Sequence, residues 1–179
     1  MWKIAALASL LLAPLMAQAE EALFDAQGYC VAHYRGTIPA PPESVRRISV
    51  QDLARLRPDA DVLLVNVLPV EGGHRDEDGT WHLASPRLSL GVPTACPRRA
   101  RGALSPQVSR WFARRVARLT RGDKTRPIVT FCLADCWMSW NAARRLRALG
   151  YRDVRWFAEG ADGRRDAGLP LAAASPEPD

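Results

Sequence analysis

Residues 128–157, IVTFCLADCWMSWNAARRLRALGYRDVRWF, decide the fold of this chain. The stretch opens with IVTFC, a short apolar run with β-branched residues that is typical of a buried parallel strand. An apolar stripe at helical spacing follows it, made of Ala142, Ala143, Leu146 and Leu149. Gly150 supplies the C-terminal stop for that helix, and DVRWF at residues 153–157 predicts a further strand. Strand, helix and strand in this order predict a parallel α/β unit.

Similar elements lie N-terminal to this unit. DVLLVNV at residues 61–67 predicts another buried strand, and Ser49 with Asp52 forms a capping-box-like start to a short helix over VQDLARL. The dipeptide Ser105-Pro106 begins a longer helix, with a cap residue and a proline at its first position. Its apolar face consists of Val108, Trp111, Phe112, Val116 and Leu119. The alternation predicts an α/β fold with an open parallel sheet flanked by helices on both faces.

The first 19 residues have the pattern of a secretory signal. Lys3 gives a positive start, residues 4–16 are almost wholly apolar, and Ala17-Gln18-Ala19 supplies the small residues that a signal peptidase reads. The apolar run is shorter than the roughly 20 residues that span a bilayer. We therefore expect residues 1–19 to be removed, and the protein to be periplasmic with no membrane contact afterwards. An uncleaved anchor is the alternative.

The rest of the chain has the size of one domain. Residues 20–47 contain tyrosines and prolines without a clean period and predict an extended N-terminal arm. The domain itself is expected to span residues 48–172, and the polar, proline-rich residues 173–179 predict a disordered tail. Within the domain, residues 69–104 are rich in Gly, Pro, Arg and Ser and predict a long irregular excursion.

The formal net charge is +6, and much of it comes from arginine. Arginines gather at residues 98–101 and along residues 110–121. An exported protein without a basic–aromatic module does not fit nucleic-acid binding. The pattern favours a solvated helix face, which leaves attraction of small anions open.

Four cysteines, Cys30, Cys96, Cys132 and Cys136, permit two disulfides in an oxidising compartment. Three pairings are open. The local spacing favours Cys132 with Cys136, which leaves Cys30 with Cys96.

Cys132 ends a predicted strand directly before a helix, where ligands bind in open α/β sheets. The positive end of the helix dipole and free backbone amides stabilise a thiolate, so we expect a lowered pKa at a sulfur that solvent can reach. Those amides would also hold an oxyanion or a persulfide. A structural cysteine packed under the sheet is the alternative.

The loop after Cys132 is expected to contact substrate. Cys136 is a candidate resolving thiol that closes a Cys132–Cys136 disulfide, although the same bond could be purely structural. The candidate substrate-binding residues are Leu133, Ala134, Asp135, Trp137 and Met138. Asp135 adds negative charge, which opposes both a depressed cysteine pKa and the binding of a dianion such as thiosulfate.

The residues of this loop bear on three kinds of cofactor. Trp137 and Trp140 either bind the face of an aromatic cofactor or pack in the core. No histidine follows the cysteines, which excludes covalent c-type haem. A Cu(I) site that joins the cysteines to a histidine is a weaker alternative, and its candidate ligands are Cys132, Cys136, His33, His74 and His82. We otherwise expect no metal site and no covalent cofactor.

Residues 48–171 resemble a rhodanese domain, most closely at IVTFC and NAARRLRALGYRDVRWFAEGADG. More narrowly, FCLADCWMSWNAARR, GALSPQ, RLTRGDK and AGLPL resemble the exported rhodanese-like proteins named for a CXXCW motif. Those proteins accompany alcohol oxidation dependent on pyrroloquinoline quinone (PQQ). The resemblance implies a rhodanese-like sheet, and it implies that Cys132 accepts a sulfane sulfur as a persulfide. It further implies association with PQQ and with a periplasmic quinoprotein dehydrogenase.

Two functions follow as hypotheses. In the first, the protein transfers sulfur or exchanges thiols on a small sulfur or thiol substrate, with Cys132 as nucleophile and Cys136 as resolving thiol. In the second, it is a non-enzymatic accessory or binding module of a periplasmic quinoprotein system.

Overall fold

The computed structural model describes residues 23–32, 35–38, 40–68, 74–77, 81–82, 88–91, 102 and 104–174. Its helices are α2 (Val50–Ala54), α3 (Pro106–Leu119), α4 (Trp137–Ala148) and α5 (Gly160–Asp166). Its strands are β1 (Arg46–Arg47), β2 (Leu63–Asn66), β3 (His74–Arg75), β4 (Trp81–His82), β5 (Leu88–Ser89), β6 (Ile128–Phe131), β7 (Val154–Phe157) and β8 (Ala172–Ala173). The expected signal segment and Cys96 lie outside the described residues.

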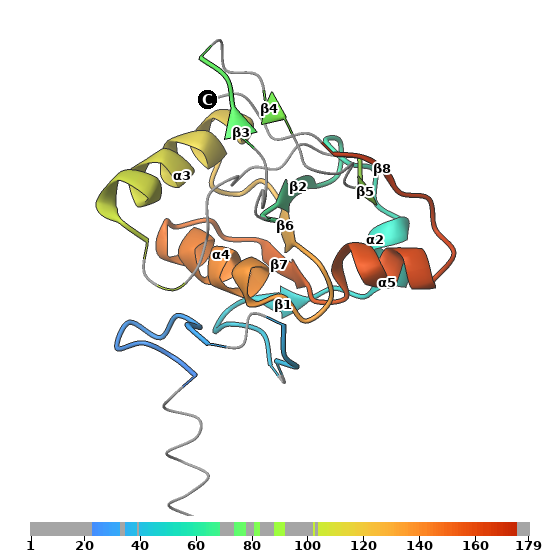
Figure 1. Cartoon of the computed structure of the whole chain (residues 1–179). Helices are drawn as coiled ribbons and strands as arrows, with labels where there is room; N and C mark the ends of the chain where they lie inside the picture. Colours follow the sequence, from blue (N-terminus) through green and yellow to red (C-terminus); the bar gives the residue numbers. More distant parts are fainter. Residues whose placement is uncertain are drawn as a thin grey trace, which may run out of the picture.

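Four strands form the central sheet in the order β1-β7-β6-β2 (Figure 1). Every neighbouring pair is parallel, and Ile128 of β6 lies in register with Leu63 of β2 and with Val154 of β7. Three of these strands match the predicted segments 61–67, 128–132 and 153–157, with β6 ending one residue before Cys132. The α/β fold with a parallel sheet is therefore confirmed.

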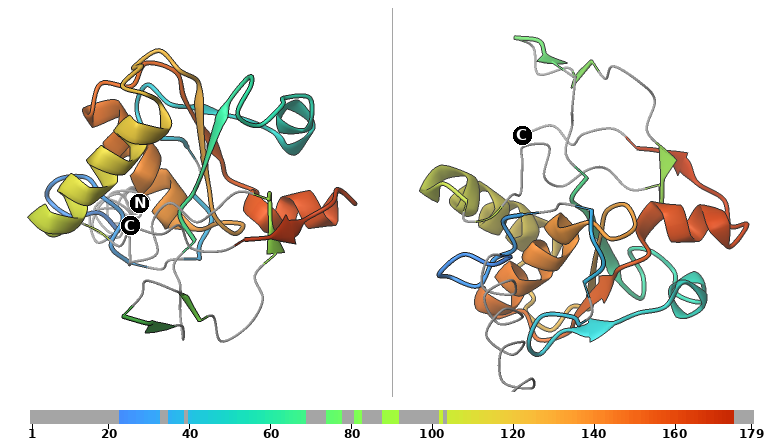
Figure 2. Two further views of the ribbon diagram at one scale, coloured as in Figure 1. Left: turned by 90° about the horizontal axis from the view of Figure 1, so that it is seen from above. Right: turned by 60° about the horizontal axis from the view of Figure 1, so that its bottom comes forward.

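Side chains of the central strands alternate between two hydrophobic clusters, because successive residues of a strand point to opposite faces. Val65, Ile128 and Trp156 pack on one face with residues of α3 and α4. Val129 and Phe131 pack on the other face with residues of α2. Figure 2 shows α3 and α4 on one side of the sheet and α2 and α5 on the other, which confirms the expected helices on both faces.

Helix α4 lies against β6 and β7 and fixes the end of the cysteine-containing loop. Leu146 is fully buried on its inner face, as the apolar stripe predicts. Thr130 of β6 donates a hydrogen bond to the Ser139 carbonyl of α4 (2.9 Å). Gly150 follows the helix with φ of +87°, the left-handed conformation that terminates helices and favours glycine.

The expected helix starts are present. Ser49 caps α2 and accepts from the Asp52 N–H, and Ser105 caps α3 and accepts from the Val108 N–H. No helix in the described ranges has the length and apolar character needed to cross a bilayer.

Several short elements differ from the sequence expectation. β1 adds an edge strand within residues assigned to the arm, and α5 follows β7 where no helix was expected. The excursion at residues 69–104 contains the β3–β4 pair and strand β5, which pairs with β8. Because Ala173 belongs to β8 and Ala174 is buried, the ordered chain runs two residues past the expected boundary at 172. Residues 175–179 lie outside the described part.

Candidate functional site

The two central cysteines lie at either end of the loop that joins β6 to α4. Cys132 directly follows the last residue of β6, and Cys136 is the N-cap residue of α4, with φ of −91° and ψ of 112°. Between them, Asp135 adopts φ of +53°, a left-handed conformation that aspartate tolerates better than most residues. This turn brings the second cysteine back toward the first.

The sulfur atoms are in contact. Cys132 Sγ lies 2.7 Å from Cys136 Sγ, about 0.65 Å longer than the ~2.05 Å of a disulfide bond. Both thiols are free, as is that of Cys30. The pair that the spacing favoured is thus held in place for disulfide formation. The companion pairing of Cys30 with Cys96 has one partner outside the described residues.

Cys132 is only 1 % exposed, and Cys136 is 3 % exposed. The expectation that solvent reaches Cys132 and that its pKa is lowered is therefore wrong. Burial removes water from the sulfur and disfavours the charged form, and hydrogen bonding to Cys136 adds to this effect, so the pKa of Cys132 is raised.

The helix terminus acts on Cys136 instead. Its pKa is lowered, first because the Cys132 thiol donates a hydrogen bond to it, and further by the backbone amides of Met138, Leu133 and Ser139. Burial opposes this shift without reversing it. Cys136 is the N-cap residue, so it lies closer than Cys132 to the positive end of the α4 dipole. Of the two thiols, Cys136 is therefore the one that ionises first, while Cys132 keeps its proton and donates it in a hydrogen bond to Cys136.

The expected substrate-binding residues have different environments. Leu133 and Ala134 are half-buried, and Asp135 is exposed. Trp137 and Met138 are buried in the hydrophobic cluster under the loop, so they face no open site in this conformation.

The N-terminal arm, with described residues 23–32, 35–38 and 40–45, covers this loop and α4. The ring of Phe24 stacks on Trp137, with centroids 6.0 Å apart, and tilts against Trp140 at 5.5 Å. The Trp137 indole N–H donates to the Gly36 carbonyl (2.7 Å), and that of Trp140 donates to the Ala40 carbonyl (3.0 Å). Both tryptophans therefore bind the arm with their polar and apolar atoms.

Asn141 of α4 holds the arm by its backbone. Its Nδ2 donates to the Cys30 carbonyl (2.9 Å), and its Oδ1 accepts from the Cys30 N–H (2.9 Å). Cys30 is fully buried, and its pKa is raised to about 12, mainly by burial. This thiol packs in the same hydrophobic cluster as the two loop cysteines.

Arg35 and Gly36 bring the arm directly onto the loop. Arg35 forms a β-bridge with Cys136, and the Gly36 N–H donates to the Asp135 carbonyl (3.0 Å). Asp162 of α5 accepts from the Arg35 guanidinium (2.9 Å) and from the Ala134 N–H (3.1 Å), which ties arm, loop and α5 together.

Gly160 allows α5 to approach the loop. It has φ of +55°, and a Cβ there would overlap the Cys132 carbonyl oxygen and lie 2.6 Å from the Leu133 carbonyl carbon. The Ala161 N–H donates to the same Cys132 carbonyl (2.9 Å).

Sequence patterns did not point to four residues of this site, which are Arg35, Asn141, Gly160 and Asp162. An asparagine inside a helix beside an apolar stripe is a signal for Asn141, because a buried amide needs partners. No comparable local signal marks Asp162 or Arg35, which act through contacts between distant segments.

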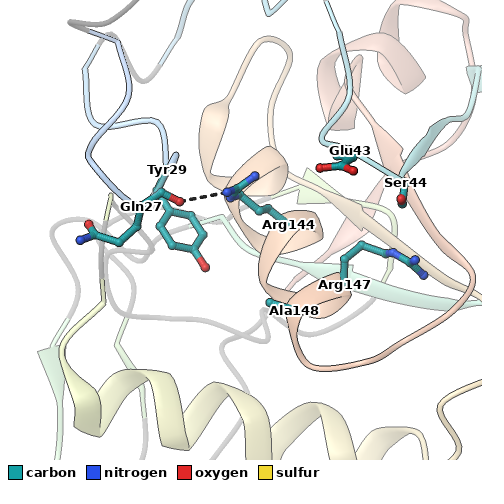
Figure 3. Close-up of a pocket in the computed structure, with 7 residues that line it drawn as sticks. All are labelled: Gln27, Tyr29, Glu43, Ser44, Arg144, Arg147 and Ala148. Carbon is teal, nitrogen blue, oxygen red and sulfur yellow. Dashed lines mark hydrogen bonds between the residues drawn. The ribbon is translucent and has the colours of Figure 1, made fainter.

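An open pocket of about 430 Å³ lies between the arm and the C-terminal half of α4. Figure 3 shows Arg144 and Arg147 extending from α4 toward it, with Arg144 bonded to the Gln27 carbonyl (3.0 Å). The remaining lining residues are Tyr29, Glu43, Ser44 and Ala148. The cysteines do not line this pocket.

The histidines do not join the cysteines. His74 and His82 lie with Asp76 in a group that includes no sulfur. The Cu(I) alternative is therefore wrong for these two histidines, and His33 lies outside the described residues.

Replacing Cys132 with alanine tests the shared proton. Cys132→Ala removes the donor that contributes most to the lowered pKa of Cys136, so we expect that pKa to rise. The Cβ chemical shift of ¹³C-labelled Cys136, followed by NMR against pH, reports it. An unchanged or lower midpoint would contradict the assignment of the proton to Cys132.

Chemically, this arrangement is a buried dithiol that can lose two electrons and two protons to form a disulfide. Cys136 has the lower pKa of the two thiols, both thiols are buried, and the arm lies against Cys136 through Arg35. No family model matches the chain, and no curated protein matches it either.

Proposed function

We propose that the protein is a thiol–disulfide redox protein of rhodanese-like type. The observation that supports this function best is the 2.7 Å contact between Cys132 Sγ and Cys136 Sγ. The lowered pKa of Cys136 and the raised pKa of Cys132 assign them different roles. These roles are the reverse of those expected from the sequence.

In the proposed reaction, the Cys136 thiolate attacks one sulfur of a substrate disulfide. A mixed disulfide forms on Cys136, and the other substrate sulfur leaves as a thiolate. Cys132 then loses its proton and attacks Cys136 Sγ, which releases the second substrate thiolate. The Cys132–Cys136 disulfide forms, two electrons pass to the substrate, and the substrate ends as two thiols. The reverse sequence oxidises a dithiol substrate.

Access to the pair requires displacement of the arm. The arm bridges Cys136 through Arg35 and is held by Asn141, Trp137 and Trp140. We propose that these contacts open locally, because parts of a fold can open at a free energy below that of global unfolding. The arm would thus limit which disulfides reach Cys136.

Sulfur transfer through a persulfide on Cys132 has less support. The persulfide would add a sulfur atom at a buried position where Cys136 Sγ already lies in contact. The raised pKa of Cys132 also makes it a poor nucleophile in this conformation.

Redox titration tests the main proposal. The protein is equilibrated in glutathione buffers of defined potential, trapped with an alkylating reagent, and mapped by peptide mass spectrometry. We expect one disulfide, between Cys132 and Cys136, to form and reduce reversibly. Cys136→Ser should abolish turnover of a small disulfide, whereas Cys132→Ser should trap the mixed disulfide on Cys136.

Cys30→Ala is the matched control. It removes a buried thiol of raised pKa and leaves the backbone that Asn141 holds, so turnover should persist. The proposal would be refuted if Cys136→Ser still turned over the small disulfide. It would also be refuted if Cys132 and Cys136 formed no disulfide at any buffer potential.

The second candidate is a non-enzymatic accessory module of a periplasmic quinoprotein system that uses PQQ. The burial of Cys132 and Cys136 favours it, because a structural dithiol needs no access to solvent. This function would be supported if the Cys132→Ser and Cys136→Ser variants still bound PQQ or still co-purified with a quinoprotein dehydrogenase. If both variants lost binding, the binding would depend on the thiols, and this candidate would lose its support.

A further inference from the structure

Two histidines face each other across the short β3–β4 pair. The strands are antiparallel, with His74 in register with His82. The imidazole rings stack with centroids 4.8 Å apart and an angle of 11° between their planes. Figures 1 and 2 show the pair projecting from the body of the molecule, apart from the central sheet.

Asp76 reaches both imidazoles with one carboxylate. Its Oδ2 lies 2.6 Å from His82 Nε2, and its Oδ1 lies 3.5 Å from His74 Nε2. Ligand atoms of the three residues all lie within 4.8 Å of one another. The side chains are 73 % exposed at His74, 50 % at His82 and 45 % at Asp76, so an ion from solution can reach them.

Two imidazole nitrogens and one carboxylate oxygen are a donor set that zinc uses. With bonds of about 2.0–2.1 Å, tetrahedral zinc holds its ligand atoms about 3.3–3.4 Å apart. Ligand atoms that lie within 4.8 Å of one another must therefore approach by no more than about 1.4 Å, which rotation of exposed side chains can supply. A fourth position stays open for water or an external ligand.

We propose that His74, Asp76 and His82 form a surface site for a borderline divalent transition-metal ion, with Zn²⁺ as the reference ion. The site is independent of the cysteine pair, because no sulfur belongs to it. A bound ion would join β3 to β4 and stabilise a pair of strands that have only two residues each.

Zinc titration of the protein, in competition with a chromophoric chelator, tests this site. Wild type should bind one Zn²⁺ that His74→Gln and His82→Gln each weaken at least tenfold, because loss of a ligand should exceed the roughly 10–100-fold cost of losing an outer partner. Asp76→Asn should weaken it as well. Ring-proton NMR signals of His74 and His82 should shift on addition of zinc.

Two controls separate this site from other zinc ligands. His33→Gln changes the third histidine of the sequence and should leave the affinity unchanged. The Cys132→Ser/Cys136→Ser double variant should also retain the ion. The proposal would be overturned if wild type bound no zinc, or if both His74→Gln and His82→Gln bound zinc with the affinity of wild type. Loss of the ion in the double cysteine variant would overturn it as well.

Discussion

Asn141→Ala is expected to raise the rate at which a thiol reagent modifies Cys136 by about 100-fold. The substitution removes both hydrogen bonds to the Cys30 backbone and leaves a buried donor and acceptor without their partners. Each orphaned group costs about 1–3 kcal/mol, so opening of the arm becomes easier by about 3 kcal/mol. Each 1.4 kcal/mol is a factor of ten in the open population, which the reaction rate follows when reclosing is fast.

Leu146→Ala is the matched control for this result. Leu146 is also a buried residue of α4, and its truncation should cost about 2–5 kcal/mol of global stability. It makes no hydrogen bond to the arm, so the modification rate in native buffer should change much less. Equal acceleration in the two variants would mean that the thiols react by global unfolding, and no acceleration in Asn141→Ala would mean that the arm does not control access.

Gly160→Ala is expected to lower the melting temperature by about 10–15 °C. The new Cβ would overlap the Cys132 carbonyl and crowd the Leu133 backbone, and neither is a flexible side chain that can swing aside. A φ of +55° adds about 1–2 kcal/mol of strain for any L-residue. A total cost of about 4 kcal/mol, at about 2–4 °C per kcal/mol for a chain of this size, gives the expected shift.

Gly150→Ala separates strain from overlap. Gly150 also has a positive φ, of +87°, but a Cβ there would meet no atom within 4 Å. We therefore expect only the conformational cost and a shift of about 3–6 °C in scanning calorimetry. Similar shifts for the two variants would show that α5 does not press on the cysteine loop.

Long, regular segments of the fold were predictable from local patterns. Compact apolar runs predicted the buried strands β2, β6 and β7, and apolar residues at helical spacing predicted the stripe of α4. Both serine caps are local hydrogen bonds. β1, with two arginines, and α5, which begins at Gly160, have no such pattern. Their formation depends on pairing with β7 and on packing against the cysteine loop.

Local patterns were enough to predict that Cys132 and Cys136 flank a strand-to-helix turn, because the turn is defined by their spacing from the apolar strand and from the α4 stripe. By contrast, long-range contacts set which thiol has the lower pKa and whether solvent reaches it. The pKa of a thiol depends on the core around it and on the amides that face it. The arm that covers the pair is held by Asn141 and Cys30, residues 111 positions apart, and no local pattern encodes such a contact.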